Sequence, residues 1–226
     1  MDILSIIPAR GGSKGIKSKN MKIINGKTLL EYSVDASLRS KWINKTVVST
    51  DDSKILKQAK KVGAEVIKRP KKLSTDSASI ESTMEHCLEF LKKEEDYIPE
   101  IIILLQNTSP LRNANHIDDA ITLFLKNKND SMLSGYNSHH FIWKSDGKNI
   151  APVNYNPKKR PNRQKFNNQF IENGAIYITK YKSFRTSKCR VSGKIGLYEM
   201  PKELSVDIDT ENDLDNVRQF MKKKSK

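Results

Sequence analysis

Residues 3–20, ILSIIPARGGSKGIKSKN, decide the fold of this chain. The apolar run from Ile3 to Ile7 breaks at Pro8, which predicts a short buried strand. A loop rich in glycines and cations, from Arg10 to Asn20, follows at once. In α/β proteins, ligands bind at the carboxyl ends of parallel strands. We therefore expect this loop to lie at a ligand site.

The remainder of the chain alternates between strand-like and helix-like segments. The strand patterns cover residues 46–50, 65–68, 101–105, 130–138, 174–179 and 195–200, and the helical patterns cover 28–38, 52–62, 77–92, 117–125 and 213–221. This alternation predicts an α/β fold with three layers and a mostly parallel sheet.

One segment, residues 139–170, departs from the alternating pattern. It is rich in Asn, Pro, Lys and Arg and has weak periodicity. We interpret it as an excursion from the core, either a lid or an arm that forms an oligomer. No repeat and no long linker divides the chain, so residues 1–226 are expected to form a single domain.

Composition narrows the classes of function. The chain has 226 residues and a formal net charge of +15, from 41 Lys and Arg against 26 Asp and Glu. It has no apolar run of about 18 residues and no secretory signal pattern, so we expect no membrane partner. The two cysteines, Cys87 and Cys189, offer neither metal spacing nor a disulfide framework, which favours reduced thiols in the cytoplasm.

The charge invites a nucleic-acid interpretation, but it suits any polyanionic ligand. Aromatic residues make up only 7% of the chain, and no RRM, KH, zinc-finger or helix-turn-helix pattern occurs. We therefore expect no nucleic-acid partner, although a nucleic-acid-binding protein remains the main rival from another class.

The loop after the first strand carries the strongest chemical signal. Gly11, Gly12 and Gly15 let backbone N–H groups approach a ligand closely. Positive charge and a hydroxyl are added by Arg10, Lys14, Lys17, Lys19 and Ser13. This combination suits a polyphosphate. It has neither the Walker A spacing nor the dinucleotide fingerprint.

A second signal is SVDIDT, residues 205–210. On an extended segment, Asp207 and Asp209 point to the same face and repel each other unless a cation or basic groups lie between them. Mg²⁺ commonly takes one or two carboxylates and completes its shell with substrate phosphates. The alternative is that Asp209 or Thr210 caps the last helix, and both interpretations can hold together.

Two further segments carry polar groups. QNTSPLR, residues 106–112, follows a strand, and its side chains suit either a polar ligand or simple turn chemistry. RPKKLSTDSAS, residues 69–79, places a cation and hydroxyls at the start of a helix, where anions are favoured.

Taken together, five segments carry a family resemblance. They are IPARGGSKGIKSKN, RPKKLSTDSAS, LLQNTSPLR, ENGAIYI and SVDIDTENDL, in this order across nearly the whole chain. The set resembles the CMP-sialic acid synthetases, also called N-acylneuraminate cytidylyltransferases. The resemblance implies a Rossmann-like nucleotidyltransferase fold and transfer of CMP from CTP to the anomeric hydroxyl of an acidic nine-carbon sugar, with release of pyrophosphate.

The same resemblance implies roles for individual residues. The catalytic positions are Arg10, Lys14, Lys19 and Asp209, and the ligands of Mg²⁺ or Mn²⁺ are Asp207 and Asp209. The nucleotide-binding positions are Arg10, Gly11, Gly12, Ser13, Lys14, Lys19, Asn20, Arg69 and Ser79. The sugar-binding positions are Gln106, Lys144, Arg163 and Tyr177. It also implies a homodimer in which residues 139–170 cross to the partner subunit.

Some alternatives stay open. Familiar sialic acid enzymes carry an aromatic pair where this chain has Arg190 and Val191, so legionaminic, pseudaminic or deaminated acids are also candidate substrates. A sugar-1-phosphate nucleotidyltransferase is a second enzymatic rival, but its longer glycine-rich loop is not found here. The residues do not choose a general base, and a metal-bound hydroxide is one candidate.

Overall fold

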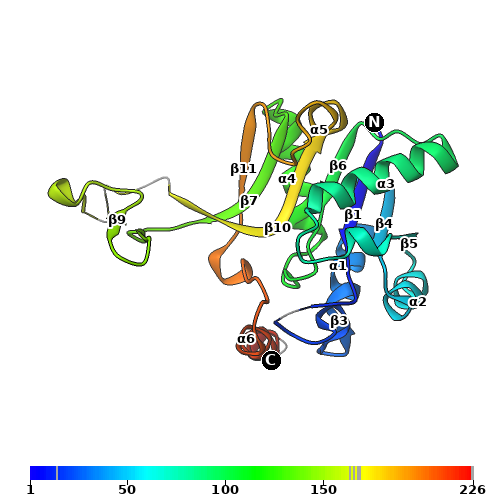
Figure 1. Ribbon diagram of the computed structural model, residues 1–226, viewed down its shortest axis with the longest axis horizontal. Coiled ribbons are helices and arrows are strands. Elements are labelled where there is room, and N and C mark those ends of the chain that lie inside the picture. The colour runs from blue at the N-terminus through cyan, green and yellow to red at the C-terminus, as the bar shows by residue number, and fades with distance from the viewer. Residues whose placement is uncertain (14, 163, 165, 167–168, 225–226) are drawn as a thin grey trace.

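A seven-stranded sheet forms the centre of the molecule (Figure 1). The computed structural model describes residues 1–13, 15–162, 164, 166 and 169–224. The strands, in spatial order, are β11 (Ile195–Glu199), β7 (Ser131–Asn137), β10 (Phe170–Lys180), β6 (Ile101–Leu104), β1 (Ile3–Pro8), β4 (Lys45–Thr50) and β5 (Glu65–Lys68). Among them only β10 runs antiparallel to its neighbours. The expected mostly parallel sheet is confirmed.

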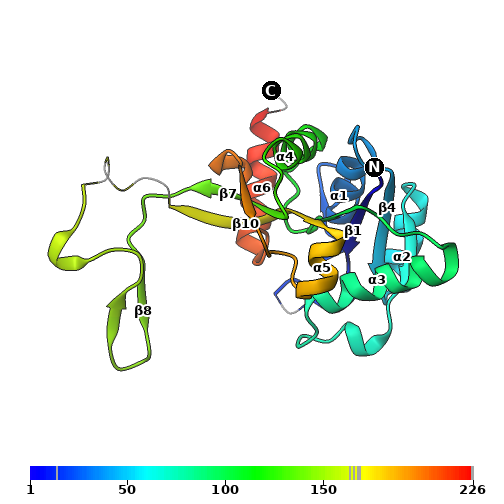
Figure 2. The same ribbon diagram turned by 90° about the horizontal axis from the view of Figure 1, so that it is seen from above.

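Helices cover both faces of this sheet. The helices α1 (Leu29–Leu38), α2 (Ser53–Lys61) and α4 (Ala114–Lys126) share one hydrophobic cluster, and α3 (Ile80–Glu95) and α5 (Tyr181–Ser187) share another. Figure 2 shows α1 and α4 on one side of the sheet and α3 and α5 on the other. The three layers that the alternating pattern predicts are therefore present.

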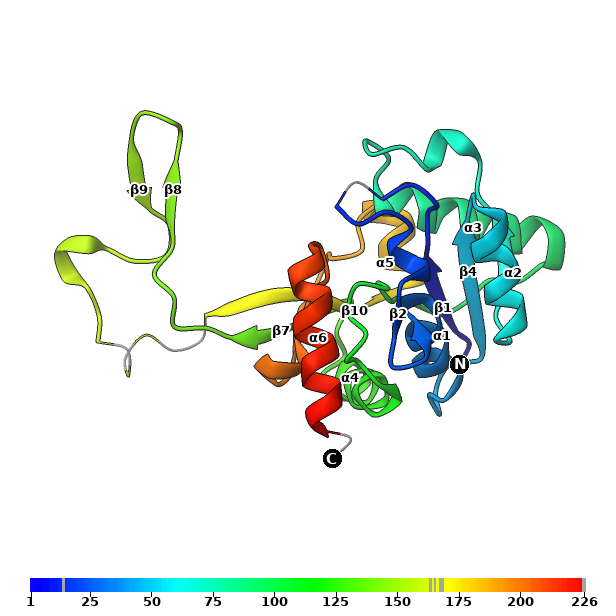
Figure 3. The ribbon, with the colours of Figure 1, turned by 90° about the horizontal axis from the view of Figure 1, so that it is seen from below.

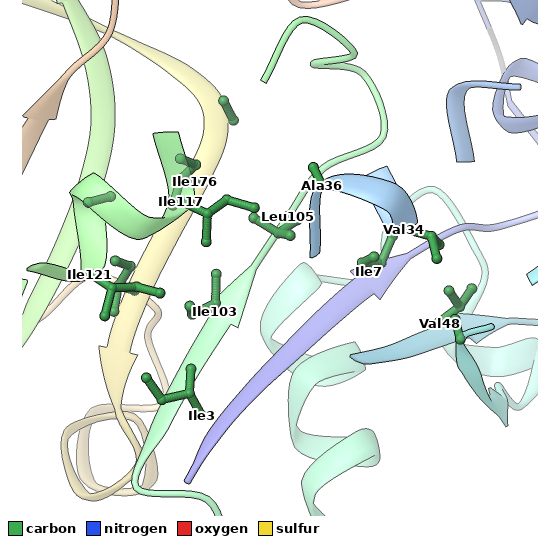
Figure 4. Close-up of a cluster of buried hydrophobic side chains, with 14 of the residues drawn as sticks. Ile3, Ile7, Val34, Ala36, Val48, Ile103, Leu105, Ile117, Ile121 and Ile176 are labelled. Carbon is green, nitrogen blue, oxygen red and sulfur yellow. The ribbon is translucent and has the colours of Figure 1, made fainter. Parts of the chain in front are cut away.

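The side chains of β1 pack against the helices on both faces of the sheet. Ile3 and Ile7 pack in the α1–α2–α4 cluster, which Figure 4 shows, whereas Leu4 and Ile6 pack in the α3–α5 cluster. Because successive side chains of a strand alternate between faces, a continuous apolar run is buried on both sides. Burying each such side chain contributes about 1.5–3 kcal/mol.

Side-chain caps set where the helices begin. Thr28 forms a capping box with Glu31 at α1, and Asp52 accepts two backbone N–H bonds at α2. Asn113 caps α4, which therefore starts three residues before the expected Ile117. Gly63 follows α2 with φ at +93°, as expected for a residue just past a helix end.

Some elements of the structure were not predicted from the sequence, and others have different bounds. The helix α5 is short and buries Phe184 alone, so its periodicity is weak. A small antiparallel ribbon, β2 (Ile23–Ile24) with β3 (Lys27–Thr28), follows the glycine loop. The strand β10 begins at Phe170, four residues before the expected start. The last helix, α6, covers Glu211–Lys224.

Between β7 and β10 the chain leaves the body as a projecting arm (Figure 3), of which the structure describes residues 138–162, 164, 166 and 169. It carries a short hairpin, β8 (Trp143–Ser145) and β9 (Ile150–Pro152). Within the arm, the Phe141 ring lies 4.5 Å from that of Tyr155 and 4.7 Å from that of Phe166. The segment thus leaves the core, whereas its role as a lid or as a dimer-forming arm stays a prediction. No helix within the described part of the chain is long and apolar enough to span a membrane.

Candidate functional site

A cavity of about 510 Å³ lies where the loops after β1, β5 and β6 meet the segment before α6. This is the carboxyl-end edge of the parallel strands, where the sequence places the site. The cavity brings together these sequence-predicted residues: Arg10, Ser13, Lys19, Asn20, Arg69, Ser79, Gln106, Asp207 and Asp209.

The glycine loop is tied at both ends. The Gly11 N–H donates to Asp51 Oδ1 over 3.0 Å, so this amide is committed within the protein instead of pointing at a ligand. At Gly15, a Cβ atom would lie 2.3 Å from the carbonyl oxygen of Asp209. Gly12 has open space around it. The loop therefore needs glycine at position 15 to approach the aspartate segment.

Lys19 joins the glycine loop to the paired aspartates. Its Nζ donates to the Ile208 carbonyl oxygen over 2.9 Å and to Asp209 Oδ1 over 3.0 Å. Beneath this contact, Ile16 of the loop and Ile208 are both buried in one small hydrophobic cluster. Residues almost 190 positions apart thereby form one wall of the cavity.

Asp207, the other aspartate of the pair, has a different environment. Desolvation in the cavity wall, together with the nearby charge of Asp209, raises the pKa of Asp207 above its usual range. A hydrogen bond from Thr108 acts in the opposite direction. Both carboxylates line the same cavity, and Lys19 pairs with one of them. Carboxylate oxygens also suit a hard ion such as Mg²⁺.

The segment also caps a helix, which was the alternative interpretation. Thr210 Oγ1 accepts from the backbone N–H of Asp213, and Asp213 Oδ2 accepts from the Thr210 N–H over 2.8 Å. Asp213 Oδ2 also accepts from the Asp209 N–H over 3.2 Å. Capping is therefore confirmed at Thr210, and the cap fixes the backbone that carries Asp209.

Arg10 meets a carboxylate across the cavity. Its Nη1 lies 2.8 Å from Oδ1 of Asp76, in the segment after β5. A smaller cavity of about 260 Å³ adjoins this pair and is also lined by Gly12, Ser13 and Thr75. The charge of Arg10 is thus already paired with a carboxylate of the same chain.

Arg69 lies deeper in the same wall. It is 6% exposed, and its guanidinium donates to the Ser49 carbonyl oxygen over 2.8 Å and to Thr83 Oγ1 over 3.3 Å. Burial lowers its pKa. Ser79 is the N-cap of α3, where its Oγ accepts from the Ser82 N–H. Both residues therefore have structural partners as well as a place in the lining.

Two asparagines fasten the glycine loop to the end of β6. Asn20 Nδ2 donates to the Arg10 carbonyl oxygen over 2.9 Å, and Asn107 Nδ2 donates to Asn20 Oδ1 over 3.1 Å. Asn107 also reaches the Pro8 carbonyl oxygen. Both side chains are almost fully buried, so they stabilise the base of the cavity.

Arg112 is buried beside this site. It is 2% exposed, and its Nη1 donates to the carbonyl oxygens of Gln106 and Ala175 over 3.1 and 3.0 Å. Its Nη2 donates to Ser33 Oγ over 2.8 Å. Desolvation lowers the pKa of Arg112 to about 9, so the guanidinium still carries its charge at neutral pH.

Two other expected sugar-side residues, Tyr177 and Lys144, do not line the cavity. Tyr177 is 3% exposed, its hydroxyl donates to Glu172, and the guanidinium of Arg190 covers its ring at 4.7 Å. Lys144 is exposed on β8 (Figure 3), which belongs to the arm, and it is not among the residues that line the cavity. Lys14 and Arg163 lie outside the described residues.

Sequence reasoning missed several residues at the site. Asp76 and Thr83 line the cavity, but neither stands out from its neighbours in the sequence. Asp51 directly follows β4, and this position at a strand end was a usable signal. Asn107 and Thr108 belong to the polar QNTS run, for which the sequence left ligand contact and turn chemistry open, and only Gln106 of this run was assigned to the site.

Known proteins resemble this chain over nearly its full length. It is 37% identical to N-acylneuraminate cytidylyltransferase A of Danio rerio, over 93% of this chain and 49% of that protein. It is 32% identical to N-acylneuraminate cytidylyltransferase of Escherichia coli, over 99% of this chain and 53% of that protein. The chain thus spans about half the length of these curated relatives.

The fold also has solved counterparts. The structure of a CMP:2-keto-3-deoxy-manno-octonic acid synthetase complexed with CTP has a TM-score of 0.72 at 17% identity, covering 99% of this chain and 100% of that one. Finally, the sequence profile of the cytidylyltransferases matches residues 4–225. Because that match covers almost every residue, the chain belongs to the cytidylyltransferase family.

Proposed function

We propose that this chain transfers CMP from CTP to the anomeric hydroxyl of an N-acylneuraminic acid, an acidic nine-carbon sugar, and releases pyrophosphate. The observation that carries the proposal is the meeting of the cationic glycine loop with Asp207 and Asp209 in one cavity. The N-acylneuraminate cytidylyltransferases at 32–37% identity support this choice of acceptor.

In the proposed reaction, the anomeric oxygen attacks the α-phosphorus, and the bond from that phosphorus to the bridging oxygen of the β-phosphate breaks. Negative charge collects on the departing pyrophosphate. Arg10, Ser13 and Lys19 line the cavity as donors for the triphosphate. The chain therefore acts by holding the two substrates in line and by neutralising charge.

Further groups that line the cavity suit the other parts of the substrates. We assign Asn20, Arg69 and Ser79 to the ribose and cytosine, and Gln106 to the acceptor sugar, since all four line the same cavity. Of these, Asn20 and Arg69 are almost fully buried, so they provide a rigid boundary.

We assign the divalent ion, Mg²⁺ or Mn²⁺, to Asp207 and Asp209. The fit is supported by the lining of the cavity, to which both carboxylates contribute, and by the raised pKa of Asp207, which comes first from burial and then from the charge of Asp209. When bound, such an ion neutralises phosphate charge and polarises the phosphoryl oxygens. Lys19 orients Asp209 through its 3.0 Å contact with Oδ1.

We further propose that two copies associate through the arm. Its side chains at Trp143, Ile150 and Val153 are 46%, 69% and 58% exposed. A two-stranded hairpin cannot bury apolar groups by itself, so a second copy is the natural cover. Lys144, which lies far from the cavity of its own chain, would then approach the cavity of the partner.

We place the reaction in the cytoplasm. Both cysteines are free thiols, with Cys87 buried and Cys189 exposed. An exposed free thiol is typical of a reducing compartment.

A pyrophosphate-release assay tests the function. CTP and Mg²⁺ are held constant while N-acylneuraminic, legionaminic, pseudaminic and deaminated acids are varied, with UTP replacing CTP as the control. We expect release with CTP and N-acylneuraminic acid. Absence of release with every nine-carbon acid would contradict the proposal, and release with another acid alone would reassign the acceptor.

A further inference from the structure

The proposed reaction assigns no role to Arg112, although it is the largest fully buried side chain of the described residues. No carboxylate pairs with it among the described residues; its partners are two carbonyl oxygens and one hydroxyl. Its Nε has no hydrogen-bond partner in the described structure. A buried charge without an opposite charge is costly compared with an apolar side chain of similar size. Such a group calls for an explanation beyond stability.

The partners of Arg112 come from three separate elements. The Gln106 carbonyl follows β6, the Ala175 carbonyl belongs to β10, and Ser33 is on α1. Ser33 Oγ in turn lies 3.4 Å from the Gln106 carbonyl oxygen. A planar guanidinium with several fixed donors can hold such acceptors in one arrangement, which a single flexible ammonium group cannot do.

The side chain of Gln106 lies against Gly174, in the neighbouring part of β10. A Cβ atom on Gly174 would lie 2.5 Å from Gln106 Oε1 and 3.9 Å from Asp207 Oδ2. Gly174 has φ at +69° and lies within the register shift of β10. The residue after it, Ala175, supplies the carbonyl that Arg112 binds. Arg112 therefore holds the peptide of Gln106 against the irregular part of β10.

We propose that Arg112 is a positioning residue for the acceptor sugar, because it fastens Gln106 to the Gly174–Ala175 peptide and thereby sets the Gln106 side chain beside Asp207. This inference rests on the proposed function, in which Gln106 faces the sugar. Arg112 itself is not among the residues that line the cavity.

The kinetic test uses Arg112→Met, Gln106→Ala and the double variant in the pyrophosphate-release assay. We expect Arg112→Met to raise KM for the acid by about 10- to 100-fold, the loss that misplacing an orienting group produces, with KM for CTP changed less than about threefold. The double variant should be no worse than the more impaired single variant, because both act through one group. Multiplying effects in the double variant would overturn the proposal.

Two variants separate positioning from general stability. Arg112→Lys keeps the charge but loses the planar guanidinium and its several fixed donors. Its KM for the acid should therefore stay raised, while its melting temperature remains near that of the wild type. Arg39→Met removes an exposed arginine, 74% accessible, and should change neither quantity. If Arg112→Lys has the wild-type KM, the guanidinium fork is not what positions Gln106.

Hydrogen exchange distinguishes failure of this inference from failure of the proposed function. In Arg112→Met, amides of residues 104–108 and 173–177 should exchange at least about tenfold faster than in the wild type, as local opening there becomes easier. This readout needs no substrate. If Arg112→Met does not fold, Ser33→Ala tests the same anchor. Unchanged exchange in these segments overturns the positioning role even when the enzyme is active.

Discussion

Asp76 holds Arg10 across the cavity that both residues line, with Oδ1 2.8 Å from Nη1. The two residues come from the loops after β5 and β1, and both side chains are partly exposed. In the proposed reaction Arg10 contacts the triphosphate. The incoming phosphate must therefore compete with Asp76 for the guanidinium.

We predict that Asp76→Asn binds CTP more tightly than the wild type. Exposed ion pairs contribute about 0.2–1 kcal/mol, which corresponds to about a 1.5- to 5-fold lower Kd. Isothermal titration of the free protein with CTP measures this. Glu94→Gln, the same charge change at an exposed residue of α3, is the control. Weaker binding by Asp76→Asn would show that Asp76 assists the nucleotide instead of competing with it.

Gly15 and Gly12 form a matched pair for a test of the loop. Gly15→Ala would place its Cβ 2.3 Å from the Asp209 carbonyl oxygen, whereas Gly12→Ala meets nothing within 4 Å. We expect Gly15→Ala to cost about 1–3 kcal/mol of unfolding free energy, as in other overpacked sites, and Gly12→Ala to stay within about 0.5 kcal/mol. Urea unfolding measures both. Equal effects would mean that the loop relaxes freely away from Asp209.

Asp209→Ala should fold normally and lose at least about 100-fold in kcat/KM, because the divalent ion that neutralises the departing phosphates then loses one of its two proposed protein ligands. Its side chain is 72% exposed, so little stability depends on it. Asp215→Ala, at a 61% exposed position on α6, is the control and should remain active. Wild-type turnover by Asp209→Ala at ordinary Mg²⁺ would end the metal assignment.

The Asp213 cap predicts a pH dependence of stability. Hydrogen bonds from the Thr210 hydroxyl and backbone N–H lower the pKa of Asp213 below its usual range. Its contribution is therefore present above the unfolded pKa of about 3.9 and is lost as the pH falls through the lowered folded value.

Asp213→Asn should accordingly lose about 1 kcal/mol at pH 7, and the difference from the wild type should shrink as the pH approaches 3. Urea unfolding at pH 7, 5 and 3 checks this. A difference that stays constant over this range would assign the effect to the shape of the side chain instead of its charge.

The exposed apolar arm predicts a change in assembly. Replacing both Ile150 and Val153 with Lys should weaken self-association at least about tenfold, because these side chains would form the buried centre of the interface. Light scattering after size-exclusion chromatography measures the mass. Ile98→Lys, at a 46% exposed position on the body, is the control. A monomeric wild type would contradict the proposed homodimer.

The sequence was sufficient for the local features. The apolar run at residues 3–7, the glycine loop, the polar capping residues and the weak periodicity of the arm all act over a few neighbouring positions. Such patterns depend on side-chain alternation and backbone propensity, which are local properties. For this reason the three layers, most strand positions and the edge that carries the site were predictable.

Only the tertiary structure decided which distant residues meet. Periodicity says that a strand is buried but not which strand it pairs with, so the antiparallel placement of β10 was not predictable. The same holds for the Lys19–Asp209 and Arg10–Asp76 ion pairs. It holds most clearly for Arg112, which reads in sequence as an ordinary loop cation. Its burial arises because three elements converge on it, and that convergence is a property of the assembled sheet and helices.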